Sequence, residues 1–320
     1  MSLPTIPAGA GSSGGTGELP RRVTKPRLAR LRSFLLLSRP HFLAGAALLY
    51  WVGAAATVGS TGGMSWDRYL IGQAMVTLIQ TLTHYSNEFF DVASDAGSTR
   101  RTWLTGGSGV LVGGALAPVV ALRAALVTAV GAGALIVWVF LLEPAAAYLG
   151  TAALVAGWFY SAPPLRLEAS GWGELVASLV VSVMVPATAA LLQMGSVPAE
   201  LWWVGAGLAM LQFAMLISFS LPDLESDLEG EKMVLAARIG AVYARRLQVL
   251  GVGTGLLMLV GAGMLGLLPP ALPLLLLPAV FAGVVQVWAS LGESTDSVRV
   301  TAAAATLLLA AAGCGVAFLV

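Results

Sequence analysis

The sequence predicts an all-α protein that crosses a membrane several times, and three observations support this fold class. Hydrophobic residues make up 58% of the 320 residues, whereas charged residues make up only 10%. Soluble domains carry roughly 25% charged residues, so 17 basic and 16 acidic side chains are too few to cover a soluble protein of this size. The hydrophobic residues also fall into long runs that turn-forming residues separate.

Nine of these runs approach the ~20 apolar residues that a helix needs to cross a bilayer. Breaks such as residues 61–63, Pro163-Pro164 and Pro269-Pro270 stand between them. We therefore expect nine transmembrane helices, and their ranges are residues 41–59, 69–90, 119–142, 145–162, 173–195, 201–221, 247–268, 271–291 and 300–320.

Residues 1–33 are expected to form a disordered basic tail ahead of one nine-helix domain at 34–320. Residues 1–20 are rich in Gly, Ser, Pro and Thr and show no period, a composition typical of disorder. Seven basic residues and no acidic residue follow between Arg21 and Arg39.

The distribution of Lys and Arg predicts the orientation, because cytoplasmic segments carry an excess of both residues. With the N-terminus in the cytoplasm, all but one of the 17 fall on the cytoplasmic side, and only Arg68 falls on the opposite side. We expect a multi-pass protein of the cell (inner) membrane, with a cytoplasmic N-terminus and the C-terminus on the opposite side.

Charge and cysteine content exclude other classes. A formal net charge of +1, with nearly every strong basic cluster in one tail, argues against a nucleic-acid partner. The single cysteine, Cys314, lies in an apolar run, so neither a disulfide framework nor a zinc thiolate cluster is expected.

Two acidic motifs stand at the cytoplasmic ends of the second and sixth predicted helices. The first contains Asn87, Asp91 and Asp95, and the second contains Asp223 and Asp227. A step of four residues along a helix turns ~400°, so the members of each motif share a face. The helix dipole disfavours carboxylates at these ends, and the carboxylates repel one another. A divalent cation removes both penalties, and oxygen ligands without Cys favour Mg²⁺ over zinc.

Basic residues near these motifs are candidates to bind phosphate, since Mg²⁺ held by few carboxylates usually shares its coordination with substrate phosphate. Each of them is equally well explained as one of the Lys and Arg residues that anchor the cytoplasmic side of a membrane protein. These residues are Arg100, Arg101, Lys232 and Arg238. The glycine-rich loop at 105–109 offers backbone N–H groups. A diphosphate at the membrane surface, with its tail among apolar helices, describes a polyprenyl diphosphate.

These residues resemble the UbiA superfamily of intramembrane prenyltransferases. Its patterns, N-x-x-x-D-x-x-x-D after helix two and D-x-x-x-D after helix six, are matched by both motifs, and the resemblance covers roughly residues 34–320. It implies a bundle with a central apolar cavity that opens to the cytoplasmic side. It also implies Mg²⁺-dependent prenyl transfer, with Asn87 in the catalytic cluster and the metal held by Asp91, Asp95, Asp223 and Asp227.

Within the superfamily the chain is most similar to the MenA branch, which prenylates 1,4-dihydroxy-2-naphthoate in menaquinone synthesis. The similar stretches are residues 38–40, 106–111, 160–164 and 171–174. The chain departs from the branch pattern G-K-x-T-L-x-x-R-x-G at Glu231 and Val234. It also lacks the Asn and Arg that often precede the second acidic motif.

The MenA resemblance implies that Arg39 or Arg166 binds the acceptor's carboxylate, although a loop anchor explains either residue equally well. His84, one turn from Asn87, is either a base or a buried hydrogen-bonded histidine. Other aromatic acceptors, including 4-hydroxybenzoate, homogentisate and other lipid or secondary-metabolite aromatics, remain alternatives. A cation-coupled transporter is the alternative from another class. Its ionisable residues are expected near the bilayer midplane, whereas these acids cluster at one face.

Overall fold

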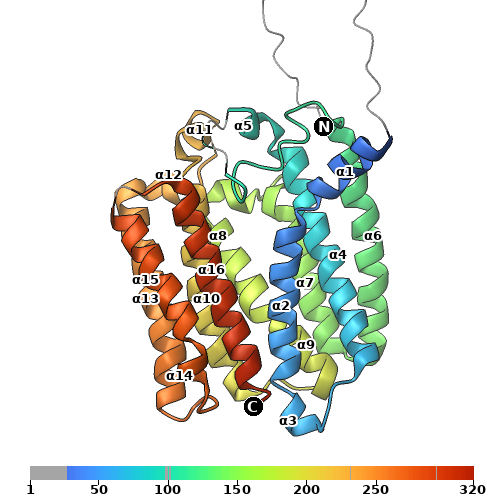
Figure 1. The fold of residues 1–320 in the computed structure, drawn as a ribbon. Helices are drawn as coiled ribbons and strands as arrows, with labels where there is room; N and C mark the ends of the chain where they lie inside the picture. The colour runs from blue at the N-terminus through green and yellow to red at the C-terminus, as the bar shows by residue number, and fades with distance from the viewer. Residues whose placement is uncertain (1–26, 98–99, 101, 231, 293) are drawn as a thin grey trace, which may run out of the picture.

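The computed structural model describes residues 27–97, 100, 102–230, 232–292 and 294–320. In these ranges the chain forms long helices that stand side by side as a bundle (Figure 1). Short helices gather at one end, namely α5 (Val92–Gly97), α11 (Leu224–Glu229) and α12 (Leu235–Ile239), and we call this the α5–α11 end. The C-terminus lies at the opposite end of the bundle.

Each of the nine predicted ranges is occupied by helix. The helices are α2 (Pro40–Ala55), α4 (Trp66–Phe90), α6 (Pro118–Leu142), α7 (Pro144–Ser161), the continuous run of α8 (Gly173–Leu179), η2 (Val180–Met184) and α9 (Val185–Met194), then α10 (Ala199–Ser220), α13 (Ala241–Met264), α14 (Leu272–Leu275) with α15 (Leu277–Leu291), and α16 (Asp296–Ala317). The remaining elements are α1 (Arg27–Leu37), α3 (Val58–Thr61) and the 3₁₀ turn η1 (Leu167–Ser170).

Length and hydropathy support fewer membrane spans than predicted. Among the described residues, five helices are long and apolar enough to cross a membrane, or six if α1 and α2, bent by 43°, form one span. Helix α4 is less apolar because it carries Gln73, Gln80 and His84, and α15 has only 15 residues. The count of nine spans therefore stays a prediction.

Helix α1 begins at Arg27, so the predicted end of the tail at residue 33 falls inside a helix. Burial holds this segment against the bundle: Leu37 is fully buried, and Phe34 packs against the cluster that contains Tyr85 and Phe89 of α4. The segment thus contacts the bundle through its apolar side chains.

Small residues let the helices approach closely around the centre of the bundle. The π-helical turn η2 precedes Pro186, which has no N–H to donate and would crowd the carbonyl four residues earlier, so a wider turn relieves the conflict. A Cβ at Gly53 of α2 would overlap the Pro186 carbonyl, so only glycine permits this contact between α2 and α9.

On the outer face, α6 exposes Val127, Val130 and Leu141, a surface suited to lipid.

Candidate active site

A cavity of about 390 Å³ extends into the bundle between α2, α4, α7, α9, α10 and α16. Its deeper wall is mostly aliphatic, with residues such as Leu49, Val76 and Leu307. Its acidic residues are concentrated at the α5–α11 end. All five residues of the two acidic motifs line this cavity, and so do Arg39 and Lys232.

The two motifs occupy equivalent breaks, where a long helix gives way to a short one. Helix α4 ends at Phe90 and α5 follows, while Pro222 separates α10 from α11. In both motifs the N–H of the second aspartate donates to the carbonyl of the first, from Asp95 to Asp91 and from Asp227 to Asp223, each at 2.8 Å. Helices α5 and α11 lie against each other. The breaks therefore bring the two acidic pairs together from distant parts of the chain.

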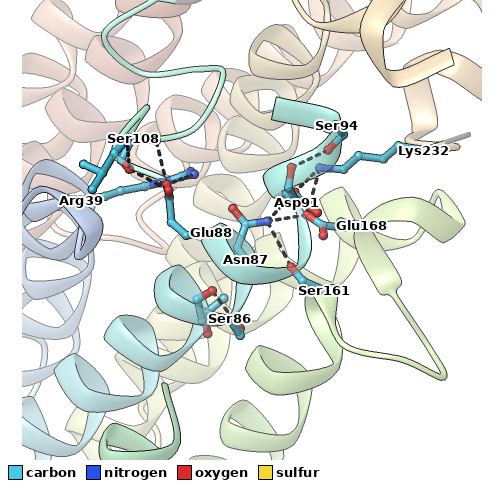
Figure 2. A network of polar contacts seen from close by, with 12 residues as sticks. Arg39, Ser86, Asn87, Glu88, Asp91, Ser94, Ser108, Ser161, Glu168 and Lys232 are labelled. Atoms are coloured by element: carbon cyan, nitrogen blue, oxygen red, sulfur yellow. Dashed lines mark hydrogen bonds and ion pairs between the residues drawn. The ribbon is translucent and has the colours of Figure 1, made fainter. Parts of the chain in front are cut away.

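Asp91 is the centre of a buried polar network (Figure 2). Asn87 Nδ2 lies 2.8 Å from both Asp91 Oδ2 and Glu168 Oε2, and 3.1 Å from Ser161 Oγ. Lys232 Nζ forms an ion pair with Asp91 and another with Glu168 Oε2 at 3.3 Å. One ammonium thus bridges two buried carboxylates that come from different elements.

The carboxyl groups at this end have shifted pKa values, because they are buried and outnumber the cations beside them. Burial raises the pKa of Asp91, but the Lys232 ammonium and hydrogen bonds outweigh it and leave that pKa below its usual range. Burial and the neighbouring Asp91 raise the pKa of Glu168. Burial, with Asp91 close by, raises the pKa of Asp95 to about 6. Burial raises the pKa of Asp227 to about 7, although Lys232 opposes the shift. Such crowding of carboxylates is typical of a functional site.

Among the described residues, the side-chain oxygens at this end are of the kind that Mg²⁺ prefers, but they are not arranged around a common point. Within the described ranges, no three His, Cys, Asp or Glu side chains converge on one point as metal ligands. The Lys232 ammonium already forms ion pairs with Asp91 and Glu168. The oxygens available at this end are carboxylate and amide oxygens, which are the ligands that hard cations prefer. The residues therefore fit Mg²⁺, provided that Lys232 moves when the ion binds.

Glu168 was not predicted as a site residue. It lies in η1, 81 positions along the chain from Asn87, and is 5% exposed. The available signal was an acid four residues after the 160–164 stretch, at the same end of the bundle as both motifs. Its side chain joins the Asp91 network only through tertiary packing, which no local spacing reveals.

A second network lies one turn away and fixes a loop beside the acids (Figure 2). Arg39 donates to Glu88 Oε1 through Nε at 3.0 Å and Nη2 at 2.7 Å. Ser108 donates its backbone N–H to Oε1 and its hydroxyl to Oε2, both at 2.7 Å. Gly107 has φ +72°, and a Cβ there would collide with the Asp95 carboxylate. The glycine-rich loop is thus held against Asp95, and Arg39 is already paired with a carboxylate of the chain.

The other predicted basic residues lie outside the cavity lining. Arg100, Arg166 and Arg238 are exposed and do not line the cavity. Arg238 donates from Nε to the Met233 carbonyl at 3.1 Å. Arg101 lies outside the described residues. Of the four residues predicted to bind diphosphate, only Lys232 is shown at the cavity.

The sequence matches the UbiA prenyltransferase family over residues 46–307. No match was found among curated protein sequences. An apo UbiA homologue from Aeropyrum pernix K1 superposes with a TM-score of 0.66 at 15% identity, covering 86% of this chain and 97% of that one.

Two further solved structures share the fold. A UbiA homologue from Archaeoglobus fulgidus, bound to DMAPP and Mg²⁺, gives a TM-score of 0.61 at 15% identity, covering 90% of this chain and 99% of that one. A digeranylgeranylglyceryl phosphate synthase gives 0.63 at 11% identity, covering 91% and 99%. At these identities the likeness is one of fold.

Proposed function

This chain belongs to the UbiA prenyltransferase family, and we propose that it transfers a polyprenyl group from its diphosphate to 1,4-dihydroxy-2-naphthoate. Family membership makes it a multi-pass membrane enzyme that uses a prenyl diphosphate. The observation that carries the assignment of the site is the position of both acidic motifs and Lys232 at one end of an apolar cavity. This arrangement suits a charged head and a hydrocarbon tail in one ligand.

We propose that Asp91, Asp95, Asp223 and Asp227 hold Mg²⁺, with Asn87 fixing the orientation of Asp91. Bound Mg²⁺ would neutralise the diphosphate and stabilise the charge that develops on it as it leaves. The clustered carboxylates and their oxygen-only chemistry support this ligand set. The Archaeoglobus homologue was solved with DMAPP and Mg²⁺, and we propose that this chain binds the same kinds of ligand.

Lys232 is proposed to exchange partners during the reaction. In the structure it is paired with both Asp91 and Glu168, so it holds positive charge where a diphosphate would arrive. When the acids bind a cation, the ammonium is free to pair with the leaving diphosphate. Arg100, Arg101 and Arg238 are proposed to attract the diphosphate from outside the cavity.

The remaining residues suit an electrophilic transfer. The allylic C–O bond breaks, and its electron pair leaves with the diphosphate. An electron-rich ring carbon then forms the new C–C bond, and in the reaction of the MenA branch the ring's carboxylate leaves as CO₂. Aliphatic residues such as Val76 and Leu307 keep water away from the allylic cation.

We propose that nine helices span the inner membrane and that the α5–α11 end faces the cytoplasm.

The acceptor is proposed from the MenA-like stretches, with Arg39 the better candidate for its carboxylate because Arg39 lines the cavity and Arg166 does not. The test supplies purified membranes with radiolabelled polyprenyl diphosphate and 1,4-dihydroxy-2-naphthoate, in Mg²⁺ or in EDTA. A lipid-soluble labelled product that requires Mg²⁺ would support both the reaction and the acceptor. Product only with 4-hydroxybenzoate or homogentisate would overturn the acceptor, and no product with any of them would overturn aromatic prenyl transfer.

A further inference from the structure

Two amide side chains and one imidazole line the largely apolar part of the cavity, below the acidic motifs. Gln80 and His84 come from α4, and Gln212 comes from α10. Each glutamine stands eleven positions before the first aspartate of its motif, Gln80 before Asp91 and Gln212 before Asp223. Along α4 this places His84 ~10 Å and Gln80 ~16 Å below Asp91, at 1.5 Å per residue.

These side chains have polar atoms whose hydrogen-bonding capacity is unmet. Gln80 Nε2 donates to the Phe42 carbonyl at 2.9 Å, which fixes the amide and leaves Oε1 to accept from elsewhere. Among the described residues, Gln80 Oε1, His84 Nε2 and Gln212 Oε1 are buried without a partner. Buried polar atoms are nearly always hydrogen-bonded, and leaving them unpaired is costly. These unpaired atoms therefore indicate a ligand that forms hydrogen bonds with them.

Neither part of a prenyl diphosphate meets those needs. A polyprenyl tail carries no hydrogen-bonding group, and the diphosphate would sit near Asp91, about 10 Å or more away along the helix axis. The cavity around them also presents aromatic rings. The Phe42 ring centroid lies 5.7 Å from that of His84 and 6.0 Å from that of Phe219, spacings that allow a planar ring to pack nearby.

We propose that Gln80, His84 and Gln212 form a subsite for the hydroxyl groups of a hydroxylated aromatic acceptor. This inference rests on the proposed function and adds how the acceptor is recognised. The Gln80 oxygen can only accept, so the ligand must donate, as a phenol or quinol hydroxyl does. Neither glutamine carries a charge that could pair with the carboxylate of an acceptor. The carboxylate therefore points toward the α5–α11 end, where Arg39 and Lys232 line the cavity. Hydrogen bonds donated by the hydroxyls also raise the electron density of the ring that attacks.

The test measures equilibrium binding to the full chain in lipid nanodiscs, in the presence of Mg²⁺ and a non-reactive prenyl diphosphate analogue. The probes are 1,4-dihydroxy-2-naphthoate and its 1,4-dimethoxy derivative, which keeps the ring and carboxylate but loses both donors. Methylation should weaken binding about tenfold or more in the wild type, the size expected when buried acceptors lose their donors. In Gln80→Leu and Gln212→Leu the two probes should bind within about threefold of each other.

Thr188→Val is the matched control, because Thr188 also lines the cavity but its hydroxyl already donates to the Met184 carbonyl at 2.8 Å. This variant should discriminate between the probes as the wild type does. Binding of the prenyl diphosphate analogue, which should stay unchanged in every variant, shows that each one is folded.

Three results would overturn the subsite. They are equal wild-type affinity for both probes, undiminished discrimination in Gln80→Leu and Gln212→Leu, or loss of the diphosphate analogue instead of the aromatic probe. Wild-type protein that binds Mg²⁺ and the diphosphate analogue but no hydroxylated aromatic would remove this inference and leave the prenyl-diphosphate site standing. Failure to bind the diphosphate analogue at all would instead remove the proposed function.

Discussion

Glu88 and Asp91 lie three residues apart at the end of α4, and both are buried carboxylates paired with a cation. Glu88 receives four hydrogen bonds from Arg39 and Ser108, which together use both of its oxygens. Asp91 shares one ammonium with Glu168 and stands near Asp95 and Asp227. The first group is complete within the chain, whereas the second has more carboxylates than cations. The comparison indicates that Glu88 stabilises the structure, whereas the carboxylates around Asp91 form a cluster suited to binding a ligand.

The largest expected effect follows from removing a carboxylate of the second group. Asp91→Ala or Asp223→Ala should reduce prenyl transfer by more than about 100-fold, because the charge on the leaving diphosphate loses its stabilisation. Transfer is measured with radiolabelled prenyl diphosphate at saturating Mg²⁺, and immunoblots of washed membranes confirm insertion. Near-normal rates in either variant would show that the metal assignment is wrong.

Lys232→Met separates the two tasks proposed for this side chain. Without the competing ammonium, Mn²⁺ should bind the protein alone more tightly, by about tenfold, since one unit of like charge leaves the site. Prenyl transfer should nevertheless fall by about 10- to 100-fold, because the leaving diphosphate loses a charged donor. Mn²⁺ binding is followed by electron paramagnetic resonance, with Lys232→Arg as the charge-retaining control. Weaker Mn²⁺ binding in Lys232→Met would contradict the exchange of partners.

Glu88→Gln tests the group that is complete within the chain. Arg39 would lose its buried counter-charge, so we expect a loss of about 3 kcal/mol of stability, seen as a lower midpoint of thermal unfolding in detergent. The KM for prenyl diphosphate should rise several-fold as the 105–108 loop loosens, with a smaller change in kcat. The control is Asp296→Asn, which breaks the Arg299–Asp296 pair away from the cavity at 2.9 Å. If Glu88→Gln abolished turnover without lowering stability, Glu88 would belong with Asp91 instead.

The smallest effect is expected at the exposed basic residues. Arg100→Ala and Arg238→Ala should change kcat/KM by less than about threefold at physiological ionic strength, because exposed charges are screened within about 8 Å. The change should grow at low salt if these residues attract the diphosphate from a distance. A loss as large as that of Lys232→Met would place either side chain in contact with the substrate.

Sequence reasoning reached the helical class, the location of the helices and the gathering of both acidic motifs, because apolar runs and four-residue spacing are local signals. It could not show Glu168 beside Asn87 or Arg39 paired with Glu88, since both contacts join distant segments. It also did not show helix at residues 27–33, because the basic residues there predict a solvated tail while Leu37 packs into the bundle.

Spacing also could not show that a helix break falls at Asp91 within the first motif and at residues 221–223, at the start of the second. Proline at 222 indicates one break, but nothing in the 87–95 segment indicates the end of α4 at Phe90. The paired breaks place the second aspartate of each motif on a short helix, and these two short helices contact each other. That arrangement depends on contacts between α5 and α11, which are tertiary.

The most direct test of the central claim is equilibrium binding of a radiolabelled prenyl diphosphate to the purified protein, with Mg²⁺ or with EDTA. The wild type should bind only with Mg²⁺, and Asp91→Asn and Asp223→Asn should each lose that binding while Asp296→Asn keeps it. Binding that persists in EDTA, or that survives both aspartate substitutions, would contradict a Mg²⁺–diphosphate site built from the two acidic motifs.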